Sequence, residues 1–123
     1  GQTARAYRVD VSDFGSVEPG VAKVTHDLGR PEVLVNCAGV GKFAHTEEET
    51  PESWGRIIGV NLTGTFLMCR AVLPHMLGGG GAIVNVSSTL SEHVAPSTAV
   101  YAATKAALNA LTKGLALELA PAG

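Results

Sequence analysis

The sequence predicts an α/β fold built on a parallel sheet. Short apolar runs alternate with longer segments of helical pattern, which is typical of strand–helix–strand units. The chain has 123 residues, of which 46% are hydrophobic and 16% charged, and this composition predicts a single domain over residues 1–123 with a buried core. The formal net charge of −2 argues against nucleic acid as a partner.

The N-terminal part of the chain is expected to hold a strand and a helix. Residues Ala4 to Val9 read as the strand, and a turn after it leads into a helix that reaches about Leu28. Ser16 as the N-cap would put Pro19 in the first helical turn, where its missing N–H costs little. Gly29 is expected to end the helix.

The middle of the chain predicts a second strand and a long helix. The apolar run Val33 to Cys37 is too short for a helix and suits a strand that is covered on both faces. A loop over Ala38–Glu49 follows, and Thr50-Pro51-Glu52 is a strong helix start. This helix is expected to continue, with some interruption, to about Leu77.

The last part of the chain predicts a strand and a helix. Gly78–Gly81 follows a helix and leads into the strand Ala82 to Val86, which is the wrong order for a phosphate-binding loop, so we interpret it as a flexible connector. The final helix, Thr98 to about Ala120, is apolar on most of its circumference, which indicates that more than one face is buried.

Cysteines and histidines give no sign of a metal site. Cys37 and Cys69 lie in apolar surroundings without metal-type spacing, and we interpret them as small buried hydrophobic residues in a reducing compartment. The four histidines are scattered and suit no ligand spacing: His26, His45, His75 and His93.

The sequence shows no leader peptide, in which a charged segment precedes an apolar one, and no apolar run of the roughly 18 residues that a membrane span needs. It therefore predicts a cytoplasmic protein without a membrane partner.

Tyr101 and Lys105 stand at positions i and i+4 of the last helix and therefore share a face. A free tyrosine has a pKa of about 10, and a nearby ammonium lowers that value by favouring the phenolate. Ser87 and Ser88 follow a strand at the end of the sheet where ligand-contacting groups gather. A hydroxyl, a phenol and an ammonium are thus expected to converge on one carbonyl oxygen. Taken alone, the spacing of Tyr101 and Lys105 is a weak signal and favours an ordinary pair on a helix surface.

Several short motifs occur together in one order and spacing. They are Asp10-Val11, Asn36-Cys37-Ala38-Gly39, Asn61 within Val60–Gly64, Ser88 thirteen residues before Tyr101, and Lys105. With them the sequence closely resembles the short-chain dehydrogenases/reductases, a Rossmann-fold family that uses NAD(H) or NADP(H), over essentially its whole length. Each residue also has a structural interpretation. Asn61 could satisfy backbone groups at a helix irregularity, Ser88 could cap a turn, and Asp10 could cap the helix after it.

The resemblance implies a role for each matched residue. It makes Ser88, Tyr101, Lys105 and Asn61 the catalytic set: Tyr101 exchanges a proton with the substrate oxygen, Ser88 orients that oxygen, and Asn61 helps to position a water-linked proton relay. Lys105 holds the nicotinamide ribose. The cofactor contacts are implied at Asp10, Val11, Asn36, Ala38 and Gly39 in addition to Tyr101 and Lys105. Ser91 stands where many family members carry glycine.

By the same resemblance the chain is a partial Rossmann fold, a doubly wound parallel sheet without the first two strands and the C-terminal strands. We expect it to be the central piece of a longer protein, without the glycine-rich loop that anchors the cofactor pyrophosphate. The choice between NAD and NADP therefore stays open. The substrate is implied to be a small alcohol or carbonyl compound, and the protein a homodimer or homotetramer paired through residues 62–77 and 98–120. The alternatives are a non-catalytic fragment or a relative that only binds.

Overall fold

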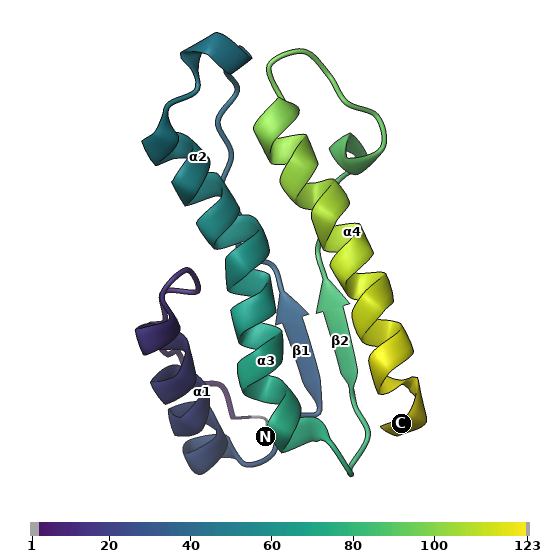
Figure 1. Ribbon diagram of the computed structural model, residues 1–123. Helices are drawn as coiled ribbons and strands as arrows, with labels where there is room; N and C mark the ends of the chain where they lie inside the picture. The colour runs from purple at the N-terminus through teal and green to yellow at the C-terminus, as the bar shows by residue number, and fades with distance from the viewer. Residues whose placement is uncertain (1–2, 123) are drawn as a thin grey trace.

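Two parallel strands and a layer of helices on one side of them form the fold of residues 3–122, which the computed structural model describes (Figure 1). Strand β1 pairs with β2 in register from Val33 opposite Ala82 to Asn36 opposite Asn85. Parallel neighbours need a long crossover, and the helical stretch between them supplies it. In order the elements are α1 (Phe14–Leu28), β1 (Val33–Asn36), α2 (Pro51–Ile58), α3 (Gly64–Met76), β2 (Ala82–Asn85) and α4 (Ala99–Leu119).

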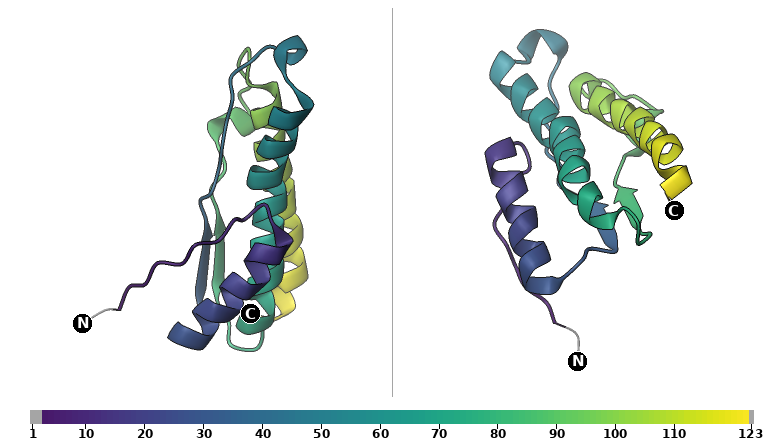
Figure 2. Two further views of the ribbon diagram at one scale, coloured as in Figure 1. Left: turned by 90° about the vertical axis from the view of Figure 1, so that its left-hand side faces the viewer. Right: turned by 60° about the horizontal axis from the view of Figure 1, so that its bottom comes forward.

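The helices cover one face of the sheet and leave the other open (Figure 2). Leu34 points into the core with 9% of its surface exposed, whereas Val33 and Val35 on the opposite face are 61% and 56% exposed. The expectation that the strand beginning at Val33 is covered on both faces is therefore wrong within residues 3–122, because every helix packs on the same side. Cys37, just past the end of β1, is exposed rather than buried, while Cys69 on α3 is buried as expected.

Ala4 to Val9 does not form the expected strand. A strand needs a hydrogen-bonded neighbour, and no segment of residues 3–122 pairs with this one. Side chains hold it instead, because the Tyr7 hydroxyl donates to the Asp27 carboxylate at 3.0 Å and Arg5 lies 3.5 Å from the same group.

Helix α1 begins earlier than the sequence suggested. Asp13 is the N-cap, and its carboxylate accepts from the N–H of Gly15 at 2.9 Å. Ser16 is not the cap, because its hydroxyl accepts from the Asp10 N–H. Pro19 consequently lies inside the helix, beyond its first turn. The helix ends at Leu28 as predicted, and Gly29 follows with a φ of 87°, which glycine adopts without strain.

The predicted long helix is confirmed together with its interruption. Thr50 caps α2 in a reciprocal capping box with Ser53, and a π-helical turn over Gly59–Thr63 joins α2 to α3. By length and hydropathy the stretch Pro51–Met76 could cross a membrane, which inspection of the sequence did not foresee. Core helices pass the same test, and Leu67, Cys69 and Val72 of this stretch belong to the core cluster.

The glycine run connects α3 to β2, as predicted, and it does so by closing a turn. Gly78 and Gly80 have positive φ angles of 81° and 68°, which glycine accommodates. The guanidinium of Arg30 donates to the carbonyls of Met76, Gly79 and Gly80 at 3.3, 3.1 and 2.9 Å. This clamp holds the turn against the start of β1.

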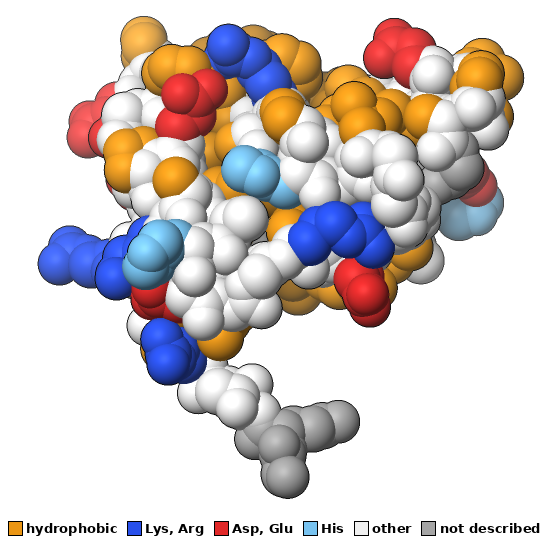
Figure 3. Space-filling view, turned by 90° about the horizontal axis from the view of Figure 1, so that it is seen from below, with side chains coloured by type: hydrophobic (Ala, Val, Ile, Leu, Met, Phe, Trp, Pro, Cys, Tyr) orange, Lys and Arg blue, Asp and Glu red, His pale blue; other side chains and the backbone are white. Residues whose placement is uncertain are grey.

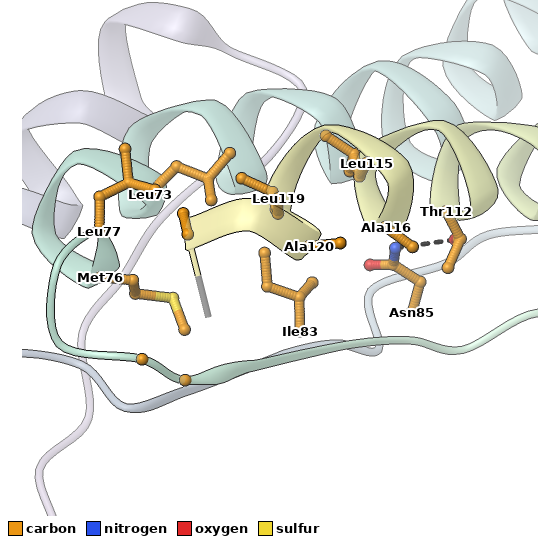
Figure 4. A pocket seen from close by; sticks show the side chains of 13 residues that line it. Leu73, Met76, Leu77, Ile83, Asn85, Thr112, Leu115, Ala116, Leu119 and Ala120 are labelled. Atoms are coloured by element: carbon orange, nitrogen blue, oxygen red, sulfur yellow. Dashed lines mark hydrogen bonds between the residues drawn. The ribbon is translucent and has the colours of Figure 1, made fainter.

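Helix α4 has the predicted extent but buries one face in residues 3–122. Ala102, Thr104, Lys105 and Leu108 are buried, while Leu117 is 80% exposed. Its C-terminal half lies beside β2 over a pocket of about 270 Å³ that is lined chiefly by hydrophobic side chains (Figure 4). Seen from this end, hydrophobic side chains also reach the surface in patches (Figure 3).

Candidate active site

The carboxyl ends of the two strands meet at paired asparagines. Asn36 Nδ2 donates to Asn85 Oδ1 at 2.9 Å and lies 3.4 Å from the Sγ of Cys69, so its side chain is used inside the fold. Burial raises the pKa of the Cys69 thiol. Asn85 in turn donates to the hydroxyl of Thr112 on α4 at 2.9 Å. The loops that carry the predicted site residues leave the sheet just beyond this point.

Lys105 projects from α4 to the end of β2. Its residue surface is 5% exposed, and its Nζ donates to the carbonyl of Val86 at 2.7 Å. Burial lowers the pKa of Lys105, and a smaller electrostatic interaction with Cys37 opposes that shift. A buried ammonium costs free energy unless polar groups surround it, so its placement here indicates a site that uses a positive charge.

Tyr101 and Lys105 lie together against the loop that follows β1. The Lys105 Nζ is 5.7 Å from the centroid of the Tyr101 ring. A Cβ atom built on Gly41 would lie 3.4 Å from the Tyr101 Cδ2, and one on Gly39 would lie 3.8 Å from the Lys105 Nζ. The backbone of Gly39–Gly41 therefore lies directly against the Tyr101 ring and the Lys105 ammonium, and we call it the Gly39–Gly41 wall.

Asn61 is fully buried in the π-helical turn and faces the same loop. Its Oδ1 accepts from the Val40 N–H at 2.8 Å and its Nδ2 donates to the Val40 carbonyl at 2.9 Å. The second Nδ2 hydrogen goes to the Thr104 hydroxyl at 3.2 Å. Its own carbonyl accepts from the Thr65 hydroxyl at 3.1 Å. Asn61 therefore satisfies backbone groups from a helix irregularity, as its structural interpretation expected, although these groups belong to the loop after β1, and its carboxamide has no donor left for a ligand.

Ser88 begins the short 3-10 helix Thr89–Ser91, which packs against α4. The Ser88 hydroxyl accepts from the Leu90 N–H at 3.2 Å, so Ser88 does cap a turn, and no hydrogen bond within residues 3–122 joins it to Tyr101. Ser91 donates to the Ser88 carbonyl at 2.6 Å and accepts from Asn109 at 3.0 Å. The serine that departs from the family pattern therefore ties this loop to α4.

Asp10 and Val11 have no hydrogen bond to that group among residues 3–122. The Asp10 carboxylate is exposed and accepts from the N–H and hydroxyl of Ser12 at 2.9 and 2.7 Å, which lowers its pKa. Val11 packs on the start of α3, where a Cβ on Gly64 would lie 2.8 Å from its Cγ2. Among residues 3–122 no hydrogen bond links Asp10 to the exposed Ala38 and Gly39.

The structure thus brings Asn61, Tyr101 and Lys105 together around Gly39 and Gly41, with Ser88 held next to α4. Sequence reasoning missed Thr104, Asn109 and Thr112, which fasten α4 to its neighbours. The available signal was their spacing, because they share one side of α4 with Tyr101 and Lys105. In the part of the chain that is described, no group of three or more His, Cys, Asp or Glu side chains could hold a metal ion.

Comparison with known proteins identifies relatives of the whole chain. The family model for short chain dehydrogenases matches residues 1–123. D-threitol dehydrogenase of Mycolicibacterium smegmatis is 42% identical over 120 residues, which cover 93% of this chain and 44% of that protein. The chain spans about half the length of the curated relatives it matches.

Solved structures match the fold closely. A gluconate 5-dehydrogenase from Burkholderia cenocepacia in complex with NADP and tartrate superposes with a TM-score of 0.89 at 36% identity, covering 93% of this chain and 45% of its own. A 3-ketoacyl-(acyl-carrier-protein) reductase from Brucella melitensis complexed with NADH gives a TM-score of 0.89 at 39% identity, with 93% and 50% of the two chains covered.

Proposed function

This chain belongs to the short chain dehydrogenase family, and on that premise we propose that the whole protein is an NAD(P)-dependent oxidoreductase that interconverts an alcohol and a carbonyl. The observation that carries the proposal is the placement of Tyr101 and the buried Lys105 against the Gly39–Gly41 backbone. The solved relatives that hold NADP or NADH support it and leave the choice of coenzyme open.

The residues present fit a nicotinamide nucleotide by their donor chemistry. Lys105 Nζ carries three N–H donors and spends one on Val86, so two remain for sugar hydroxyls such as those of the nicotinamide ribose. Glycine at position 39 keeps the backbone beside the ammonium open to close approach. Asn36, Ala38 and Gly39 are proposed to offer backbone contacts, and Asp10-Val11 to contact the adenine. When bound, the nucleotide supplies or accepts hydride, which no side chain can do.

The chain's own groups handle the proton and the orientation of the substrate. Tyr101 donates a proton to the carbonyl oxygen during reduction and takes it back from the alcohol during oxidation. The Lys105 ammonium stabilises the negative charge that the phenolic oxygen then carries. Ser88 accepts a hydrogen bond from Leu90 and keeps its own hydroxyl hydrogen for the substrate oxygen.

Asn61 serves this site through the loop it holds. Its carboxamide is fully hydrogen-bonded to Val40 and Thr104, so Asn61 fixes the Gly39–Gly41 wall and does not contact a ligand with its side chain. A part in a proton relay would then fall to its carbonyl, which already accepts from Thr65. Asn61 is thereby proposed to hold the cofactor wall and the start of α3 in one geometry.

Turnover by the whole protein tests the proposal. The absorbance of reduced nicotinamide is followed with NADH and NADPH against a 3-oxoacyl thioester, a polyol, a sugar acid and simple ketones. Turnover with at least one compound is expected, and it should disappear on Tyr101→Phe. Saturable coenzyme binding without turnover on any of them would favour the alternative, a relative that only binds. The presence together of Ser88, Tyr101 and Lys105 speaks for the enzyme.

We also propose that the whole protein self-associates through residues 62–77 and 98–120. Phe66 and Leu77 from the first range are 47% and 53% exposed, and Leu117 from the second is 80% exposed. Large apolar side chains exposed on two adjacent helices suit a symmetric contact between copies. Sedimentation at micromolar concentration is expected to show a dimer or tetramer, and a monomer would refute this.

A further inference from the structure

A buried hydrogen-bonded chain connects the three segments that form the candidate site. It starts at the Val40 backbone, passes through the Asn61 carboxamide to the Thr104 hydroxyl, and ends at the Tyr101 carbonyl, which accepts from Thr104 at 2.7 Å. Asn61 is 0% and Thr104 1% exposed. The chain thus runs from the loop after β1, across the π-helical turn, to the helix that bears the phenol and the ammonium.

Every donor in this chain has a partner. Both Nδ2 hydrogens of Asn61 are used, and the Thr104 hydroxyl both accepts and donates. An unsatisfied donor at full burial is costly, so removing the hydroxyl would force Asn61 to turn or admit water. Either change disturbs its paired bonds to Val40 and moves the Gly39–Gly41 wall relative to Tyr101 and Lys105.

We propose that Thr104 is a positioning residue of the active site, whose hydroxyl sets α4 against the Gly39–Gly41 loop so that Tyr101 and Lys105 face the reacting groups. This inference rests on the proposed function for its effect on turnover. Thr104 touches neither substrate nor cofactor in the proposal and acts through Asn61 and the Tyr101 backbone.

Helix α4 offers a matched control for this residue. Thr112 accepts from Asn85 Nδ2 at 2.9 Å and donates to the Leu108 carbonyl at 2.8 Å, which repeats the same asparagine–threonine bond about two turns further along. This second bond fastens α4 to the last residue of β2 beside the hydrophobic pocket, and no hydrogen bond among residues 3–122 links Thr112 to the Gly39–Gly41 loop or to Tyr101. Loss of either bond should lower stability, more so for the fully buried Thr104 bond, but only the Thr104 bond should affect the chemistry.

The test compares Thr104→Val, Thr104→Ser and Thr112→Val in the whole protein by kcat, KM, coenzyme Kd and melting temperature. Thr104→Val is expected to lower kcat by about tenfold to a hundredfold, because a misplaced proton donor costs rate steeply, while the coenzyme Kd changes less. Thr104→Ser should restore kcat to within about twofold of wild type, because it keeps the hydroxyl. Thr112→Val should lower the melting temperature and leave kcat within about twofold.

The proposal is overturned if Thr104→Val keeps kcat within about twofold, or if Thr112→Val lowers kcat as much as Thr104→Val does. The NMR amide resonances of Gly39 and Gly41 report the position of the loop independently of turnover. They therefore test the proposed role of Thr104 even if no substrate is turned over. They should shift in Thr104→Val and stay in place in the other two variants, and unshifted resonances in Thr104→Val would contradict the inference. Thr104→Ala provides the same readings if the valine variant does not fold.

Discussion

At the carboxyl end of the sheet Asn61, Thr104 and Lys105 are buried and hydrogen-bonded, whereas the pocket that begins at the amino end and extends along β2 is lined chiefly by hydrophobic side chains. That pocket lies between α4 and the glycine connector before β2 (Figure 4). Among residues 3–122, only the carboxyl end has a buried ammonium beside a phenol.

The difference shows that a cavity by itself does not identify a catalytic site. Lining side chains such as Leu73, Ile83 and Leu119 shape the pocket but carry no group that could donate or accept a proton. Buried polar groups cost free energy unless they are paired, so a cluster of them indicates a site more strongly than an apolar volume does. Changes at the two ends should therefore have separable effects, on turnover at one and on stability at the other.

The largest separation is expected from Tyr101→Phe in the whole protein. Removing the phenolic hydroxyl should lower turnover by about 10²–10⁴-fold, which is the usual contribution of general acid–base catalysis, and should leave coenzyme affinity nearly unchanged. Steady-state kinetics and a fluorescence titration with reduced coenzyme measure the two effects. Turnover within about twofold of wild type would show that Tyr101 is not the proton donor.

Lys105→Ala should affect both binding and turnover, because one ammonium serves the ribose and the phenol. We expect turnover to fall by about 10²-fold and the coenzyme Kd to rise by about tenfold, as for the loss of a charged hydrogen bond. Lys113→Ala, on an exposed position of the same helix, is the control and should change neither. A fall in turnover with unaltered coenzyme affinity would show that the dual role is wrong.

At the amino end Gly81→Ala should affect stability alone. The added Cβ would meet the Met76 Cε and would lie 2.7 Å from the Glu32 carbonyl oxygen, which belongs to the backbone and cannot move aside easily. Overpacking of this kind costs about 1–3 kcal/mol in the free energy of unfolding. Gly114→Ala has open space around it and should be neutral or stabilising. Chemical denaturation measures the free energy of unfolding of both variants. A raised coenzyme Kd in Gly81→Ala would show that this turn affects the cofactor site, which would contradict the prediction.

The smallest effect is expected from Asp27→Asn, which loosens the N-terminal segment. A hydrogen bond with His26, and then one from Tyr7, hold the Asp27 pKa at about 2, below its ordinary value of 3.8. A lowered folded-state pKa stabilises the fold above the unfolded value, and that stabilisation is lost as the pH falls from about 4 towards 2. Melting temperatures across this range should fall more steeply for wild type than for Asp27→Asn. Equal slopes of melting temperature against pH would contradict the stabilising role assigned to Asp27. Glu118→Gln is the control for the loss of one negative charge.

Local signals in the sequence predicted the parts of the fold that depend on neighbouring residues. Thr50-Pro51 begins a helix, Gly29 ends one, and the glycine run makes a connector, because capping and positive φ are settled within a few residues. The strand expected at Ala4–Val9 and the cover expected over Val35 depend on distant segments. No local pattern shows whether such partners are present, and both predictions were wrong for residues 3–122.

The candidate site divides in the same way. The helix spacing of Tyr101 and Lys105 predicted that they lie together, and the structure agrees. The partners of Asn61 could not be read from the sequence, because Val40 and Thr104 meet it only after the π-helical turn and α4 are packed. The residue type of a threonine inside a helix gives no signal, since its hydroxyl bonds to the preceding turn whether it is exposed or buried, so only the spacing of Thr104 from Tyr101 and Lys105 pointed to it.

A titration of isotopically labelled whole protein with NADH or NADPH tests the contrast between the two ends most directly. The amide resonances of Gly39, Gly41 and Lys105 report on the carboxyl end, and those of Gly80, Leu115 and Leu119 report on the hydrophobic pocket. We predict saturable shifts in the first group and none beyond the noise in the second. Shifts concentrated at the pocket, with Gly39 and Lys105 unmoved, would contradict the assignment of the cofactor site to the carboxyl end of the sheet.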